Sequence, residues 1–187
     1  VSDVYANMFG VCSYTADLPR SMQILTYLTT NADFRNLLSN ASVLHDIGEL
    51  VNYSNHHVLS QVMIENSDMV GFDCDELHMM GLIVRFHHKK FPGPKDPLLK
   101  DLDGYDNAAV RMCSMFLRIS DIIDRHRNSV VSDIAASFGK SGFLITLISS
   151  GDAEMERWRL CRLSSDFLKL FGCPLNVAVE PQSADSE

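Results

Sequence analysis

Apolar residues recur three and four positions apart along most of the first two thirds of the chain, which predicts amphipathic helices. The stretch from Asp33 to Ile47 stops at Gly48 and places His45 and Asp46 in the last turn of its helix. Asp73 and Glu76 have the spacing of a capping box, so another helix begins there. The remaining helices are predicted at residues 18–31, 56–66 and 107–127.

The pattern changes after residue 128. Two β-branched runs, at 142–149 and 175–179, predict strands, and an amphipathic helix at about 152–171 separates them. We therefore predict a mainly α (α+β) fold in a single domain spanning 1–187. Its helical core covers about 17–128, its small strand-helix-strand appendage covers about 140–180, and 181–187 form a disordered tail.

Composition narrows the class of protein. Apolar residues make up 46% of the 187 positions and charged residues 21%, which is ordinary for a folded globular chain. The net charge of -8 argues against nucleic acid as a partner. Five cysteines without a CxxC spacing indicate reduced thiols and a cytoplasmic protein. The sequence has no apolar span long enough for a membrane, and its start at Val1 suggests a piece of a longer chain.

His45 and Asp46 are the strongest candidates for chemistry, because an adjacent imidazole and carboxylate at a helix end can hold a divalent cation. The alternative is a buried His–Asp hydrogen bond without a metal. A second candidate is the basic stretch from Arg85 to Lys100, beside a proline-rich loop at 91–97. It can bind a polyanion, or be a solvated helix end whose cations offset the helix dipole.

Several segments, taken in order, resemble the C-terminal HD-type domain of the exopolyphosphatase / guanosine pentaphosphate phosphohydrolase (Ppx/GppA) family. They are LHDIG at 44–48, VNYSNHHVLS, IENSDMVGF, LIVRFHHKK at 82–90, LRISDIIDR at 117–125 and WRLCRLSSDFLKLFGCPLNV. The resemblance covers roughly residues 17–180. It implies an HD-domain-like helical bundle, preceded in a longer parent chain by two actin-like ATPase-fold domains that contain the phosphoanhydride-cleaving site.

The resemblance also implies a set of metal ligands: His45, Asp46, His87 and Asp121. Helical periodicity alone would bury His88 more deeply than His87, whereas the resemblance selects His87. Manganese, magnesium, iron or zinc would suit these ligands. No histidine precedes residue 45, and Leu59 replaces a histidine of many relatives, so an empty site is as well supported as an occupied one.

For the remaining polar residues we predict three roles. Phosphate groups of polyphosphate or a phosphorylated nucleotide are expected to contact His57, Arg85, His88, Lys89 and Lys90. His56 is expected to be an exposed residue at a helix start. Asp124 and His126 are expected to lie at a solvated helix end.

These observations support two functions. The first is the C-terminal domain of an exopolyphosphatase-type hydrolase, which binds polyphosphate or guanosine polyphosphate for an active site elsewhere and supports homodimerisation. The chain is then part of an enzyme without being active alone. The second is an autonomous metal-dependent HD-type phosphohydrolase acting on a phosphate ester. A scaffold that binds neither ligand is the third alternative.

Overall fold

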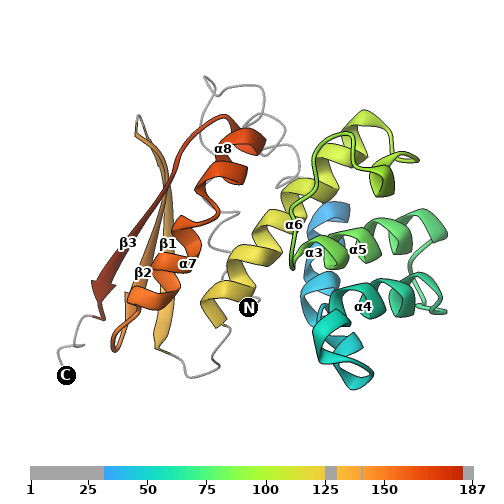
Figure 1. Ribbon diagram of the computed structural model, residues 1–187, viewed down its shortest axis with the longest axis horizontal. Helices are drawn as coiled ribbons and strands as arrows, with labels where there is room; N and C mark the ends of the chain where they lie inside the picture. Colours follow the sequence, from blue (N-terminus) through green and yellow to red (C-terminus); the bar gives the residue numbers. More distant parts are fainter. Residues whose placement is uncertain (1–31, 125–129, 140, 183–187) are drawn as a thin grey trace. The chain divides into compact units, whose positions relative to one another are not determined.

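The computed structural model describes residues 32–124, 130–139 and 141–182 (Figure 1). It divides into two compact units whose boundary falls between Arg118 and Ile119. We call the described residues 32–118 the helical unit and those from 119 to 182 the sheet unit, and treat each by itself. The prediction of a single domain stays a prediction.

The helical unit contains α3 (Ala32–Leu44), α4 (His56–Glu65), α5 (Cys74–Phe86) and most of α6 (Gly104–Asp124). Helix α5 packs against both α3 and α4 (Figure 1). Their apolar stripes bury Leu38, Met80 and Ile83 completely. Short 3-10 turns, η2 (Ile47–Leu50), η3 (Tyr53–Asn55) and η4 (Pro97–Leu99), connect the helices.

Most predicted helices of this unit are confirmed, with one correction at the candidate site. The capping box forms in both directions between Asp73 and Glu76. Helix α3 ends at Leu44, so the prediction that His45 and Asp46 lie in its last turn is wrong. The two residues form a turn, where the His45 ring bonds to the carbonyl of Ser42 in the last turn of α3. The predicted helix at 18–31 lies outside the described residues.

The sheet unit contains three strands in the order β1-β2-β3. Strand β1 (Val131–Gly139) pairs antiparallel with β2 (Gly142–Ser149), and β3 (Leu175–Pro181) pairs parallel with β2. Helices α7 (Glu154–Cys161) and α8 (Ser164–Phe171) form the crossover between β2 and β3, on one face of the sheet (Figure 1). Gly172 ends α8 in the left-handed conformation, with φ 73°.

Two predictions about this unit need correction. The helix predicted at 152–171 is two helices, separated by a turn at Arg162 and Leu163. Strand β1 was not predicted. Strands β2 and β3 agree with the predicted runs, although β3 continues to Pro181. The predicted disordered tail lies almost entirely outside the described residues.

The predicted fold class is confirmed: the described residues form six α-helices and a small mixed sheet near the C-terminus. The packing of the sheet unit is aromatic, with Phe167 stacked between Phe143 and Phe171 at ring-centroid distances of 5.6 and 4.3 Å. Within the described ranges, no helix combines the length and the apolar character needed to cross a membrane.

Candidate metal centre

The turn that contains His45 and Asp46 is held closely against the start of α4. The Gly48 N–H donates to Ser60 Oγ at 2.9 Å, and that hydroxyl donates to the His45 carbonyl oxygen at 2.8 Å. A Cβ atom on Gly48 would lie only 2.3 Å from the His56 carbonyl oxygen. The glycine of the LHDIG segment is therefore required by the close approach of two backbones.

The other side of the centre is the end of α5, which is fixed by Arg118 from α6. The buried Arg118 guanidinium donates from Nε to the His87 carbonyl at 3.0 Å, and from Nη2 to the carbonyls of Phe86 and Lys89, each at 2.8 Å. Lys89 is in the left-handed region, with φ 57°, a conformation that lysine rarely adopts. These three bonds hold the backbone that positions His87 and His88.

Three histidine rings are oriented by their own backbones. The Nδ1 atoms of His45, His56 and His87 bond to the carbonyl oxygens three residues earlier, at Ser42, Tyr53 and Val84. A carbonyl oxygen only accepts, so each Nδ1 must donate the hydrogen. In a neutral imidazole, this leaves the Nε2 atom with a lone pair.

These Nε2 atoms converge on the Asp46 carboxylate. His45 Nε2 lies 3.2 Å from Oδ2, and His56 Nε2 lies 3.5 Å from Oδ1. His87 Nε2 lies 3.9 Å from Oδ1 and 3.2 Å from His56 Nε2. Lone pairs and a negative charge repel one another at such distances unless a cation, either a proton or a metal ion, lies between them.

The local electrostatics keep Asp46 ionised and His87 neutral. Burial raises the pKa of the Asp46 carboxyl. The protonated form of His45, through its hydrogen bond and charge, and the protonated forms of His87 and His56, through their charges, outweigh burial and place this pKa below its usual value. Burial is the main reason why the pKa of His87 falls to about 3, since the bond to Val84 and the charge of Asp46 oppose the shift. An anionic carboxylate beside a neutral imidazole is the protonation state that metal binding requires.

The structure brings together three of the four predicted metal ligands. His45, Asp46 and His87 meet. His87 is buried and His88 is only partly buried, so the burial order predicted from helical periodicity is wrong. The fourth, Asp121, lies in the part of α6 that belongs to the sheet unit, and its ligand role stays a prediction.

Sequence reasoning missed His56. It was expected to be exposed, but only 6% of its surface is accessible, and with Asp46 and His87 it forms a group whose ligand atoms lie within 4.8 Å. The bond to Tyr53 turns its ring inward, and this depends on the η3 turn, which apolar periodicity does not reveal. Asp124 is exposed, as expected, and His126 lies outside the described residues.

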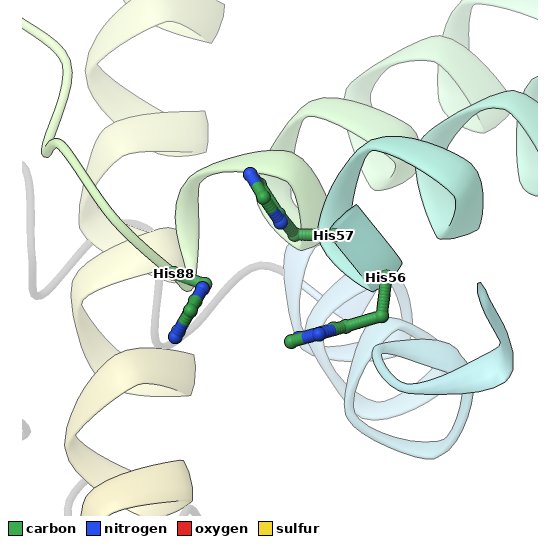
Figure 2. Close-up of side chains that lie close together, drawn as sticks. All are labelled: His56, His57 and His88. Carbon is green, nitrogen blue, oxygen red and sulfur yellow. The ribbon is translucent and has the colours of Figure 1, made fainter. Parts of the chain in front are cut away.

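The predicted phosphate-binding residues lie next to this centre. His57 and His88 contact each other, with ring centroids 5.4 Å apart, and Figure 2 shows them together with His56. Burial, followed by the charges of Lys89, His88, Arg85 and His56, lowers the pKa of His57 to about 4. The surroundings of His57 are therefore electropositive, which favours anions nearby.

Two of the remaining cations are accessible at the surface. Lys89 and Lys90 are exposed, and Lys89 Nζ donates to Asn55 Oδ1 at 3.0 Å, which links the end of α5 to the start of α4. A pocket of about 490 Å³ opens beside Asn55, and its lining is Val51, Asn52, Asn55, Val58 and Leu59. An apolar wall with two carboxamides suits a flat polar ring better than a bare anion.

The fold and the site together define a mainly helical domain with a small mixed sheet and a buried histidine–aspartate cluster at one end of its helices. Residues 11–172 match the family model described as Ppx/GppA phosphatase, domain III. The match spans most of the 187 residues, so this chain belongs to the Ppx/GppA phosphatase family as its domain III. This confirms the family that the sequence resembled.

Proposed function

We propose that this domain binds polyphosphate, or a phosphorylated nucleotide such as a guanosine polyphosphate, through a divalent cation and adjacent basic side chains. In this proposal it serves an active site located in actin-like ATPase-fold domains of a longer parent chain. The main support is the convergence of Asp46 with three imidazoles whose Nδ1 atoms are already bonded to backbone carbonyls. Metal-ligating histidines typically have their second nitrogen fixed in this way.

The donor set fits a borderline transition metal. Asp46, His56 and His87 offer one oxygen and two nitrogens, and His45 lies against the other Asp46 oxygen. Imidazole with carboxylate suits zinc, iron or manganese better than calcium or magnesium, which prefer oxygen alone. The chemistry that such a cation supplies when bound is Lewis-acid polarisation of a phosphate oxygen or activation of water.

The basic residues beside the centre would hold further phosphate groups. Lys89 and Lys90 offer exposed ammonium groups, Arg85 is half-buried, and His57 and His88 can each donate at least one N–H. A nucleoside attached to these phosphates would lie near the pocket lined by Asn55 and Leu59. Polyphosphate has no nucleoside and would leave this pocket empty.

Binding to the purified chain tests this proposal. We expect polyphosphate of defined length to bind the manganese-loaded chain, with an affinity that falls steeply as salt is raised. Replacing Lys89 and Lys90 together by alanine should weaken binding about thirtyfold, because each removes a charge-assisted contact of about 1 kcal/mol. Calorimetry at two salt concentrations measures both effects.

The matched control is the double variant Lys95→Ala and Lys100→Ala, which removes the same charge from exposed lysines of the same stretch. It should leave the affinity within a factor of about two. Equal losses in the two double variants would mean that only net charge matters, and would refute a localised site. A guanosine polyphosphate that binds more tightly than polyphosphate of equal charge would identify the nucleotide as the ligand.

The second candidate function is autonomous hydrolysis of a phosphate ester at the same centre. It is favoured by the accessibility of Asp46, whose side chain is 26% exposed, so that a substrate can reach the carboxylate. In this case a stoichiometric metal and phosphatase activity should both disappear in Asp46→Asn. Activity that survives this substitution would exclude the centre as its source.

Homodimerisation, which belongs to the first of the two functions predicted from the sequence, remains part of the proposal. Leu50, Val51 and Tyr53 are large apolar residues with 85%, 69% and 76% of their surfaces exposed on adjacent turns. Grouped exposed apolar residues are typical of interaction surfaces.

A further inference from the structure

A second group of imidazoles lies directly beside the Asp46 centre. His56 and His57 are the first two residues of α4, and His88 follows the C-cap of α5. Their ring centroids are 5.1 Å apart for His56 and His88, 5.4 Å for His57 and His88, and 5.6 Å for His56 and His57. Figure 2 shows the three rings arranged around one space, and one nitrogen from each lies within 4.8 Å of the others.

His57 has a buried nitrogen that the described protein does not satisfy. Only 5% of the residue is exposed, and its Nδ1 atom is buried with no hydrogen-bond partner among the described residues. A buried polar atom without a partner destabilises the folded state. Folded proteins rarely retain such an atom unless a ligand, an ion or a water satisfies it.

The chemistry of this group favours a cation of a particular class. The residues are imidazoles only, without a carboxylate, and imidazole nitrogen suits zinc, nickel, cobalt or copper and not calcium or magnesium. An anion would instead need several hydrogen-bond donors, of which neutral imidazole has one.

We propose that His57 and His88, with His56 at the junction, form a second transition-metal site beside the Asp46 centre. Because His56 can offer only Nε2, its Nδ1 being bonded to Tyr53, one ion at a time binds this nitrogen, and the other ion is held by its remaining ligands. Lys89 and Arg85 are close enough to influence His57, and their positive charge weakens the second site relative to the first. Because His56 also belongs to the Asp46 centre, this inference partly rests on the proposed function.

Counting bound metal tests the second site. The chain is stripped with a chelator and titrated with cobalt(II) alone, while the d–d absorption is followed and the metal content of desalted samples is measured. We expect two equivalents for the unmodified chain, bound with separable affinities. His57→Gln should retain only the tighter equivalent, and Asp46→Asn should retain only the equivalent that depends on His57.

His78→Gln is the matched control, because His78 is a histidine of the same unit that pairs with Glu65 outside both groups. It should still bind two equivalents. A single equivalent in the unmodified chain that persists in a folded His57→Gln variant would overturn the inference, as would two equivalents in that variant. A single equivalent that persists in Asp46→Asn but is lost in His57→Gln would instead refute the metal of the proposed function and leave this second site standing.

A measurement on unmodified protein covers the case in which the variants fail to fold. Crystals of the 187-residue chain soaked in cobalt(II) should give an anomalous-scattering peak next to both His57 and His88. A peak at Asp46 with none between these two imidazoles would overturn the second site.

Discussion

The two units of this domain bury different kinds of side chain. In the described helical unit, the interior includes the rings of His56, His57 and His87 and the guanidinium of Arg118. In the described sheet unit, the interior is built around Phe143, Phe167 and Phe171, and its buried polar side chains are two serines and one glutamate, Ser120, Ser149 and Glu156.

This difference distinguishes residues that stabilise the fold from residues that form the candidate site. Apolar burial stabilises a fold at about 25 cal/mol for each Å² removed from water, whereas burying an imidazole or a guanidinium costs free energy unless it is bonded. The apolar interior of the sheet unit is therefore what stability alone favours. The buried histidines of the helical unit are not needed for stability, which points to a role in binding. Three predictions test this contrast.

The largest effect is expected for Arg118→Met, which leaves three main-chain carbonyls at the end of α5 without their donor. We expect a loss of about 3 kcal/mol in the free energy of unfolding, because buried unsatisfied acceptors are costly. Urea denaturation measures it.

Arg157→Met in the sheet unit is the control, because the Arg157 side chain is 43% exposed and forms a surface ion pair with Glu154. Its midpoint should be that of the unmodified chain. Similar midpoints for both variants would show that Arg118 does not fix the histidine-bearing turn.

Gly48→Ala should cost about 2 kcal/mol, because the added Cβ meets the His56 carbonyl and the backbones must separate. It should also weaken metal binding, since the displaced turn carries His45 and Asp46. Gly93→Ala, with no atom within 4 Å of its new Cβ, is the matched control and should change neither stability nor binding. An unaltered metal affinity in a Gly48→Ala chain would argue against a preformed centre.

The third prediction is a loss of stability in acid. In the folded, metal-free chain the pKa of His87 is about 3 and that of His57 about 4, below the usual 6.5. The unfolded chain therefore binds protons more readily below pH 6.5, and stability falls as the pH is lowered from 6.5 towards 4. For His87 the slope is at most about 1.4 kcal/mol per pH unit. Urea denaturation with a chelator at pH 7, 6 and 5 checks this, and His87→Gln should flatten the slope.

Periodicity was a good guide wherever one face of an element is apolar. It located α4, α5, α6 and β2 within a few residues. It missed β1 because only Ile134 of that strand is buried, so that main-chain pairing with β2 holds the strand and its side chains leave no alternating pattern. It also joined α7 and α8, since the turn at Arg162 and Leu163 contains neither glycine nor proline.

The candidate site was only partly predictable for a similar reason. The adjacent His45 and Asp46 were evident, and family resemblance selected His87. His56 joins the group because a 3-10 turn rotates its ring, and Arg118 matters because its partners lie 29 to 32 positions away in sequence. Neither the rotation of the His56 ring nor the partners of Arg118 can be recognised from the spacing of residues along the chain.

The left-handed backbone of Lys89 has a consequence for how such a domain changes over time. Glycine would adopt this conformation with less strain, yet it would remove the ammonium group that reaches Asn55. At this position the backbone conformation favours glycine, whereas the proposed binding of an anion favours lysine. A relative with glycine here would keep the fold and lose the ammonium group proposed to bind phosphate.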